Sequence, residues 1–165
     1  MIKLSYGKEI DQAMTCFDIA DYFIWLANES GSFISNLKLQ KLVYYAQAWH
    51  LALYDQPLFD EDFEAWIHGP VIPVLYQQYK SFGRKPIDKD VREKDIEFPS
   101  NINEFLEQLS NEYFHCDARE LELMSHLEDP WLLARNGLDK DISCSTIISK
   151  DSMKKYYKAC VEESH

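Results

Sequence analysis

The densest group of potentially reactive side chains lies in the stretch EAWIHGPVIP, residues 64–73. His68 could act there as a general base or a metal ligand, provided that a carboxylate, a nucleophile or further ligands lie within reach. The sequence nominates no such partner. Gly69 can adopt backbone angles closed to other residues, and Pro70 fixes its own angle and biases its predecessor away from helix. The stretch therefore predicts a rigid turn beside Trp66, with His68 as a structural histidine.

The other candidates for catalysis or metal binding are scattered along the chain. His115 and Cys116 are neighbours and His126 follows, but no HExxH or CxxC spacing brings two ligands to one side of an ion. There is also no nucleophile elbow and no glycine-rich phosphate loop. We therefore expect no metal, no cofactor and no enzymatic activity. A hydrolase that uses His68 or His126 with nearby carboxylates stays open as an alternative.

Composition narrows the class of protein further. A chain of 165 residues with a formal net charge of -11 is expected to form one domain and to be repelled by nucleic acid phosphates. The charged N-terminus does not resemble a signal peptide, and no window offers the roughly 20 apolar residues of a membrane span. The four cysteines are widely spaced, as in proteins that keep reduced thiols. We therefore expect a cytoplasmic protein without a membrane or nucleic acid partner.

Apolar residues recur at helical spacing along most of the chain. Thr15 with Asp18 and Asp117 with Glu120 have the spacing of capping boxes, which mark helix starts, and Gly31 stands where the first helix would end. This pattern predicts a mainly α, compact single-domain bundle of about six helices. The first is expected at residues 16–29. The longest follows Ser35, and we expect it to be the central element and to bury one stripe of its surface.

Smaller elements and boundaries are also predicted. Residues 63–67 and 142–148 are the strand candidates and would form a short antiparallel two-stranded element. Residues 84–100 mix both charge signs with two prolines and predict an exposed loop. Residues 1–14 would form an N-terminal extension and residues 15–163 the domain.

Aromatic residues are more numerous than one core easily encloses, at 14% of the chain. Tyr44, Tyr45 and Trp49 fall outside the predicted buried stripe of the long helix. Because tryptophan, tyrosine and arginine dominate protein interfaces, this side of the helix is a candidate contact surface for a partner protein.

Two sequence blocks carry a resemblance to a known family. The first, LKLQKLVYYAQAWHLALYDQPLFDEDFEAWIHGPVIPVLYQQY at residues 37–79, and the second, LMSHLEDPWLLAR at residues 123–135, resemble the two blocks of the Panacea domain family, whose members include SocA-like and GepA-like phage-associated proteins. The closing IISKDSMKKYY resembles the terminal helix of that family. The resemblance covers roughly residues 15–157.

The resemblance implies a helical domain that acts as the antitoxin of a toxin–antitoxin pair and neutralises a cognate toxin protein by direct contact. It implies no catalytic residues, and the sequence leaves the oligomeric state open. A transcriptional regulator and an uncharacterised hydrolase remain alternative functions. We further hypothesise that the turn at residues 68–70 fixes Trp66 against the long helix and so orders the contact surface. The candidate partner-binding residues are Tyr44, Tyr45, Trp49, Trp66, His68, Gly69, Pro70, Trp131 and Arg135.

Overall fold

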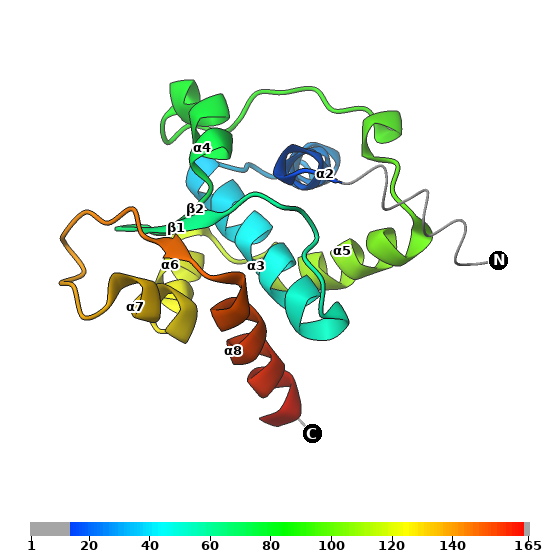
Figure 1. The fold of residues 1–165 in the computed structure, drawn as a ribbon. Helices are drawn as coiled ribbons and strands as arrows, with labels where there is room; N and C mark the ends of the chain where they lie inside the picture. The colour runs from blue at the N-terminus through cyan, green and yellow to red at the C-terminus, as the bar shows by residue number, and fades with distance from the viewer. Residues whose placement is uncertain (1–13, 164–165) are drawn as a thin grey trace.

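A computed structural model describes residues 14–163 (Figure 1). The predicted N-terminal extension, residues 1–14, lies outside the described residues except for its last residue. The fold is mainly α, as predicted. In chain order the elements are α2 (Cys16–Ser30), α3 (Asn36–Tyr54), β1 (Phe63–Trp66), β2 (Gly69–Val71), α4 (Pro73–Tyr79), the 3-10 turns η1 (Lys80–Phe82) and η2 (Glu93–Ile96), α5 (Ser100–Tyr113), α6 (Ala118–His126), α7 (Asp129–Arg135), β3 (Ile147–Ile148) and α8 (Lys150–Glu163).

Local capping residues set the helix ends. Thr15 and Asp18 form the predicted capping box at the start of α2, and Gly31 ends that helix in the left-handed region at φ 68°. Ser35 caps α3, and Asp117 forms a second capping box at the start of α6. These helix starts are confirmed because each cap depends on atoms within one turn of the chain.

Helix α3 runs through the middle of the molecule and contacts α2, α5, α6, α8 and β2 (Figure 1). Residues 39–48 of this helix are all buried. The expected single buried stripe is therefore wrong, because neighbours cover α3 on every side along these residues. Its central position is confirmed.

Buried polar side chains of α3 tie neighbouring loops to the helix. The Gln40 side chain accepts a hydrogen bond from the backbone N–H of Ile72 at 3.0 Å. The Gln47 side chain accepts from the N–H of Leu58 and donates to the carbonyl of Phe59, both at 2.7 Å. Each amide provides a hydrogen-bond partner for backbone that would otherwise be buried without one. A buried backbone group left without a partner costs about 1–3 kcal/mol of stability.

The small sheet has three strands in the order β2-β1-β3, all antiparallel. A strand at residues 63–67 is confirmed as β1, but the second strand of the hairpin, β2, was not predicted. It begins at Gly69, directly after the two-residue turn, so that Trp66 pairs with Gly69. Within residues 142–148, only Ile147–Ile148 form a strand.

The predicted exposure of two tyrosines of α3 is wrong. Tyr44 and Tyr45 are at most 1% exposed, because α8 brings Tyr157 against both rings. The hydroxyls of Tyr45 and Tyr157 donate to the same Glu128 oxygen, each at 2.7 Å. These side chains belong to the core that joins α3 to α8.

The segment 84–100 is more than an exposed loop. Ile87, Val91 and Ile96 are buried, and the N–H of Ile87 donates to the carbonyl of Ile34 at 2.9 Å. The apolar residues hold this charged segment on the core. Among residues 14–163, none of the helices combines the length and apolar character needed to cross a membrane.

Candidate functional site

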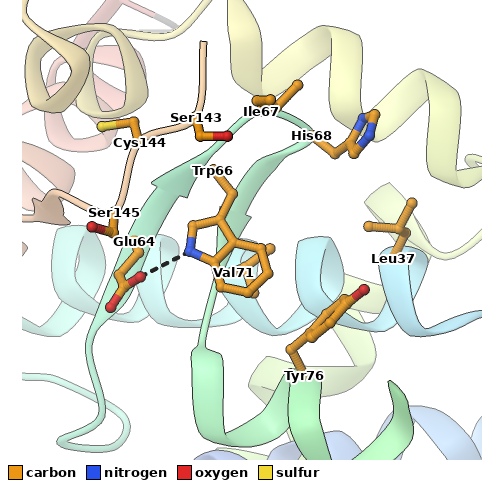
Figure 2. A pocket seen from close by; sticks show the side chains of 10 residues that line it. All are labelled: Leu37, Glu64, Trp66, Ile67, His68, Val71, Tyr76, Ser143, Cys144 and Ser145. Carbon is orange, nitrogen blue, oxygen red and sulfur yellow. Dashed lines mark hydrogen bonds between the residues drawn. The ribbon is translucent and has the colours of Figure 1, made fainter. Parts of the chain in front are cut away.

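The outer face of the β1–β2 hairpin forms one wall of an open pocket of about 460 Å³ (Figure 2). Strand β1 alternates, with Phe63 and Ala65 buried in the core and Glu64 and Trp66 half-buried on the other face. We call this cavity the hairpin pocket. Its lining residues are Leu37, Glu64, Trp66, Ile67, His68, Val71, Tyr76, Ser143, Cys144 and Ser145.

Trp66 is the largest side chain in the hairpin pocket. Its indole Nε1 donates to Glu64 Oε1 at 2.8 Å, and its ring meets the ring of Tyr76 at 5.1 Å and 63° (Figure 2). Tyr76 belongs to α4. The hypothesis placed Trp66 against the long helix; the ring contact in the structure is with α4, and the long helix contributes Leu37 to the same pocket.

Two side chains of helix α7 donate hydrogen bonds to backbone carbonyls of β1. Trp131 Nε1 donates to the carbonyl of Trp66 at 2.8 Å, and Arg135 Nη1 donates to the carbonyl of Ala65 at 2.9 Å. The Arg135 guanidinium also lies 4.7 Å from the Trp131 ring. Trp131 and Arg135 are only 3% and 4% exposed, so they position the strand and offer little surface to a partner.

The glycine of the hairpin stands where a side chain would not fit. Gly69 has φ +102°, and a Cβ at this position would lie 2.8 Å from both Lys41 Cε and Ser125 Oγ. Pro70 is buried, and its carbonyl accepts a hydrogen bond from Lys41 Nζ at 3.2 Å. The predicted rigid turn thus also allows α3, α6 and the hairpin to approach one another closely.

Lys41 is a supporting residue that the sequence analysis missed. The side chain is fully buried, and this burial lowers the pKa of its ammonium group to about 7, although the nearby Glu122 carboxylate partly opposes the shift. Lys41 is the only charged residue between Leu39 and Ala48, and this was the available signal. Glu64 was also missed, although the two-residue period of a strand places it on the same face as Trp66.

The two candidate catalytic histidines differ in their surroundings. His68 is exposed at the pocket rim, and its Nδ1 lies 3.3 Å from Glu122 Oε2, which also accepts from Arg119 Nη1 at 3.2 Å. His126 stacks on Trp131 at 4.1 Å, and burial lowers its pKa. Within residues 14–163, no cluster of three or more His, Cys, Asp or Glu side chains could hold a metal ion.

Trp49 lies apart from the hairpin pocket. It lines a second cavity of about 480 Å³ beside α5 and donates from Nε1 to the Tyr113 hydroxyl at 2.7 Å. The nine candidate residues therefore fall into separate groups. Trp66 and His68 face the hairpin pocket, Gly69, Pro70, Trp131 and Arg135 support it, and Trp49 lies at the second cavity, while Tyr44 and Tyr45 are in the core.

A loop at residues 143–145 lines another wall of the hairpin pocket. Burial alone would raise the pKa of the Cys144 thiol, but side-chain and backbone hydrogen bonds with Thr146, together with the charge of Arg135, outweigh it and lower that pKa. This wall of the pocket carries small polar side chains, in contrast to the aromatic wall.

The chain is similar in sequence to a known protein family and to one of its named members. The profile of the family described as "Antitoxin SocA-like, Panacea domain" matches residues 39–132, which include most of α3, the hairpin and α6. The protein named Antitoxin SocA from Caulobacter vibrioides (strain NA1000 / CB15N) is 35% identical over 115 residues, which cover 63% of this chain and 61% of that relative. No solved structure matches the chain. Since the family profile spans more than half of the sequence, the chain belongs to the SocA-like antitoxin family with a Panacea domain.

Proposed function

We propose that this protein is an antitoxin that neutralises a toxin by direct protein contact at the hairpin pocket. Its family and the name of the Caulobacter relative support the antitoxin role. The matched region spans about three fifths of that relative. The observation that carries the choice of surface is the open pocket of about 460 Å³ built around the half-buried Trp66.

Tryptophan in a well-packed pocket is the kind of residue that dominates binding energy at protein interfaces. The backbone that carries Trp66 is held by Trp131 and Arg135 from α7 and, through Pro70, by Lys41 from α3. Such support reduces the conformational entropy lost on association. Trp66 and His68 are therefore the proposed contact residues, and the buried residues are proposed to position them.

The net charge of -11 supports a basic partner, because complementary charge accelerates encounter and disfavours wrong partners. The same charge gives no support to direct binding of DNA, since phosphate contacts supply most of that affinity. A transcriptional regulator is therefore the weaker alternative.

Growth provides the first test. The gene beside the coding sequence is co-expressed with this chain, and growth is compared with expression of the neighbouring gene alone. We expect the neighbour to arrest growth and this chain to restore it, with both proteins recovered together in a pull-down. Trp66→Ala should reduce rescue, whereas Phe33→Ala, which removes a 76% exposed ring outside the hairpin pocket, should not. Equal rescue by both variants would exclude the hairpin pocket as the contact surface.

A hydrolase has one observation in its favour, the contact between His68 and Glu122 at 3.3 Å. Purified protein can be assayed against ester, amide and phosphoester substrates. We expect no turnover above that of the His68→Ala variant. A signal that disappears in this variant would replace the antitoxin proposal with an enzymatic one.

A further inference from the structure

We propose that the hairpin pocket binds an arginine side chain of the partner protein. This inference rests on the proposed function, since it names the group by which the toxin would be recognised at the same site. It is carried by the aromatic rings, the carboxylate and the absence of lysine and arginine from the residues that line the pocket.

The aromatic wall suits a cation. Trp66 and Tyr76 are both half-buried and meet at 5.1 Å and 63°, so that together they line one corner of the pocket (Figure 2). The only N–H of the indole is already donated to Glu64 Oε1. What Trp66 still offers to a ligand is its ring surface, and aromatic rings attract cations that lie within about 6 Å of their centres.

The lining of the pocket is acidic. Glu64 is its only carboxylate, and the ten lining residues include no lysine or arginine, although the Arg135 guanidinium lies behind the strand at the carbonyl of Ala65. No ion pair among residues 14–163 involves Glu64. A guanidinium group would pair with this carboxylate, whereas an anionic ligand would be repelled and an apolar side chain would bury the charge unpaired.

The remaining walls match the rest of an arginine side chain. The half-buried Leu37 supplies apolar surface against which its methylene groups can pack. Arginine is preferred to lysine because its planar guanidinium can both stack on an aromatic ring and bind a carboxylate through two N–H groups. A volume of about 460 Å³ falls within the range of small-molecule sites, about 300–1,000 Å³, so flanking residues of the partner also have room.

The test uses small probes and requires no toxin. The full chain, labelled with ¹⁵N, is titrated with Nα-acetyl-arginine methylamide, with its neutral citrulline analogue and with its lysine analogue. The readout is the NMR signal of the Trp66 indole N–H, assigned with Trp66→Phe. We expect a saturable shift with the arginine probe, at least fivefold weaker binding of the lysine probe, and no saturation with citrulline.

Two glutamate variants separate the pocket from general charge effects. Glu64→Gln keeps an oxygen for the indole N–H and should weaken the binding of the arginine probe at least tenfold. Glu112→Gln, which alters a carboxylate beside the second cavity, should leave binding unchanged. The remaining NMR signals report whether each variant is folded. Saturation by citrulline, equal binding of the lysine probe, or unchanged binding by a folded Glu64→Gln protein would overturn the proposal.

This test and the growth assay can fail independently. Rescue of growth without arginine binding would remove this inference and leave the antitoxin proposal intact. Arginine binding without rescue would contradict the proposed function while supporting the chemistry of the pocket.

Discussion

Replacement of the buried lysine of α3 tests how the hairpin is supported. Lys41→Met keeps a side chain of similar length but removes the amine that donates to the Pro70 carbonyl. The ammonium has a pKa of about 7 in the folded protein and 10.5 as its ordinary value. Between these values the unfolded chain binds a proton that the folded protein does not, so wild-type stability should rise with pH in this window.

The size of the effect follows from the two pKa values. Because folding lowers the pKa of Lys41, the ionisation of this residue destabilises the folded protein by about 4 kcal/mol at pH 7. This destabilisation is smaller by about 1.7 kcal/mol at pH 8.5. Lys41→Met lacks this contribution but leaves the Pro70 carbonyl without its donor, at a cost of about 1–3 kcal/mol. We therefore expect the variant to be more stable than the wild type at pH 7 and to lose that advantage as the pH rises.

Urea unfolding of both proteins at pH 7, 7.5, 8 and 8.5 measures this difference. Subtracting the unfolding free energy of one protein from that of the other cancels the titration of groups common to both, including the thiols. A difference in unfolding free energy that stays constant within about 0.5 kcal/mol across the series would show that Lys41 is not buried with a lowered pKa.

Two further substitutions test the support of the hairpin, and a third tests the core between α3 and α8. Gly69→Ala should cost at least ~2 kcal/mol in urea unfolding, because φ is +102° and the new Cβ would meet Lys41; unchanged stability would refute the close approach. Trp131→Phe should cost about 1–3 kcal/mol and weaken toxin binding, because it removes the donor to a strand carbonyl, and binding at wild-type strength would show that this bond does not position the pocket. Burial raises the pKa of Glu128 above its ordinary 4.5, so the contribution of this carboxyl to stability should fall as the pH rises above 4.5; the difference in unfolding free energy between wild type and Glu128→Gln should therefore change with pH in that direction, and a constant difference would refute the raised pKa.

The sequence was sufficient for features that depend on neighbours within one turn of the chain. Thr15 and Asp117 cap their helices through atoms three residues away, and Gly31 ends α2 through its own backbone angle. The alternation of β1 is equally local, although it was not used to place Glu64 beside Trp66. Capping and strand alternation depend on nearby residues and not on tertiary contacts, so both can be predicted from the sequence.

The burial of two side chains that depends on a distant helix was predicted wrongly. The rings of Tyr44 and Tyr45 were expected on the surface because they lie outside the apolar stripe of α3. They are buried because α8 places Tyr157 against them, and the hydrogen bond between the hydroxyls of Tyr44 and Tyr157 joins residues 113 positions apart. Nothing in the periodicity of α3 specifies which of its sides α8 will cover.

The close approach at the hairpin explains why two parts of the first sequence block, residues 37–42 and 68–70, belong together. In LKLQKL the second lysine, Lys41, enters the core and reaches a carbonyl of the hairpin, while in HGP the glycine leaves the space that this lysine occupies. The proline that follows supplies the carbonyl and has no N–H of its own to satisfy. A larger residue at position 69 or a shorter one at position 41 would disturb the same contact, and with it the strand that carries Trp66. Gly69 and Pro70 of β2 and Lys41 of α3 therefore form one structural unit, and the hairpin pocket depends on all three.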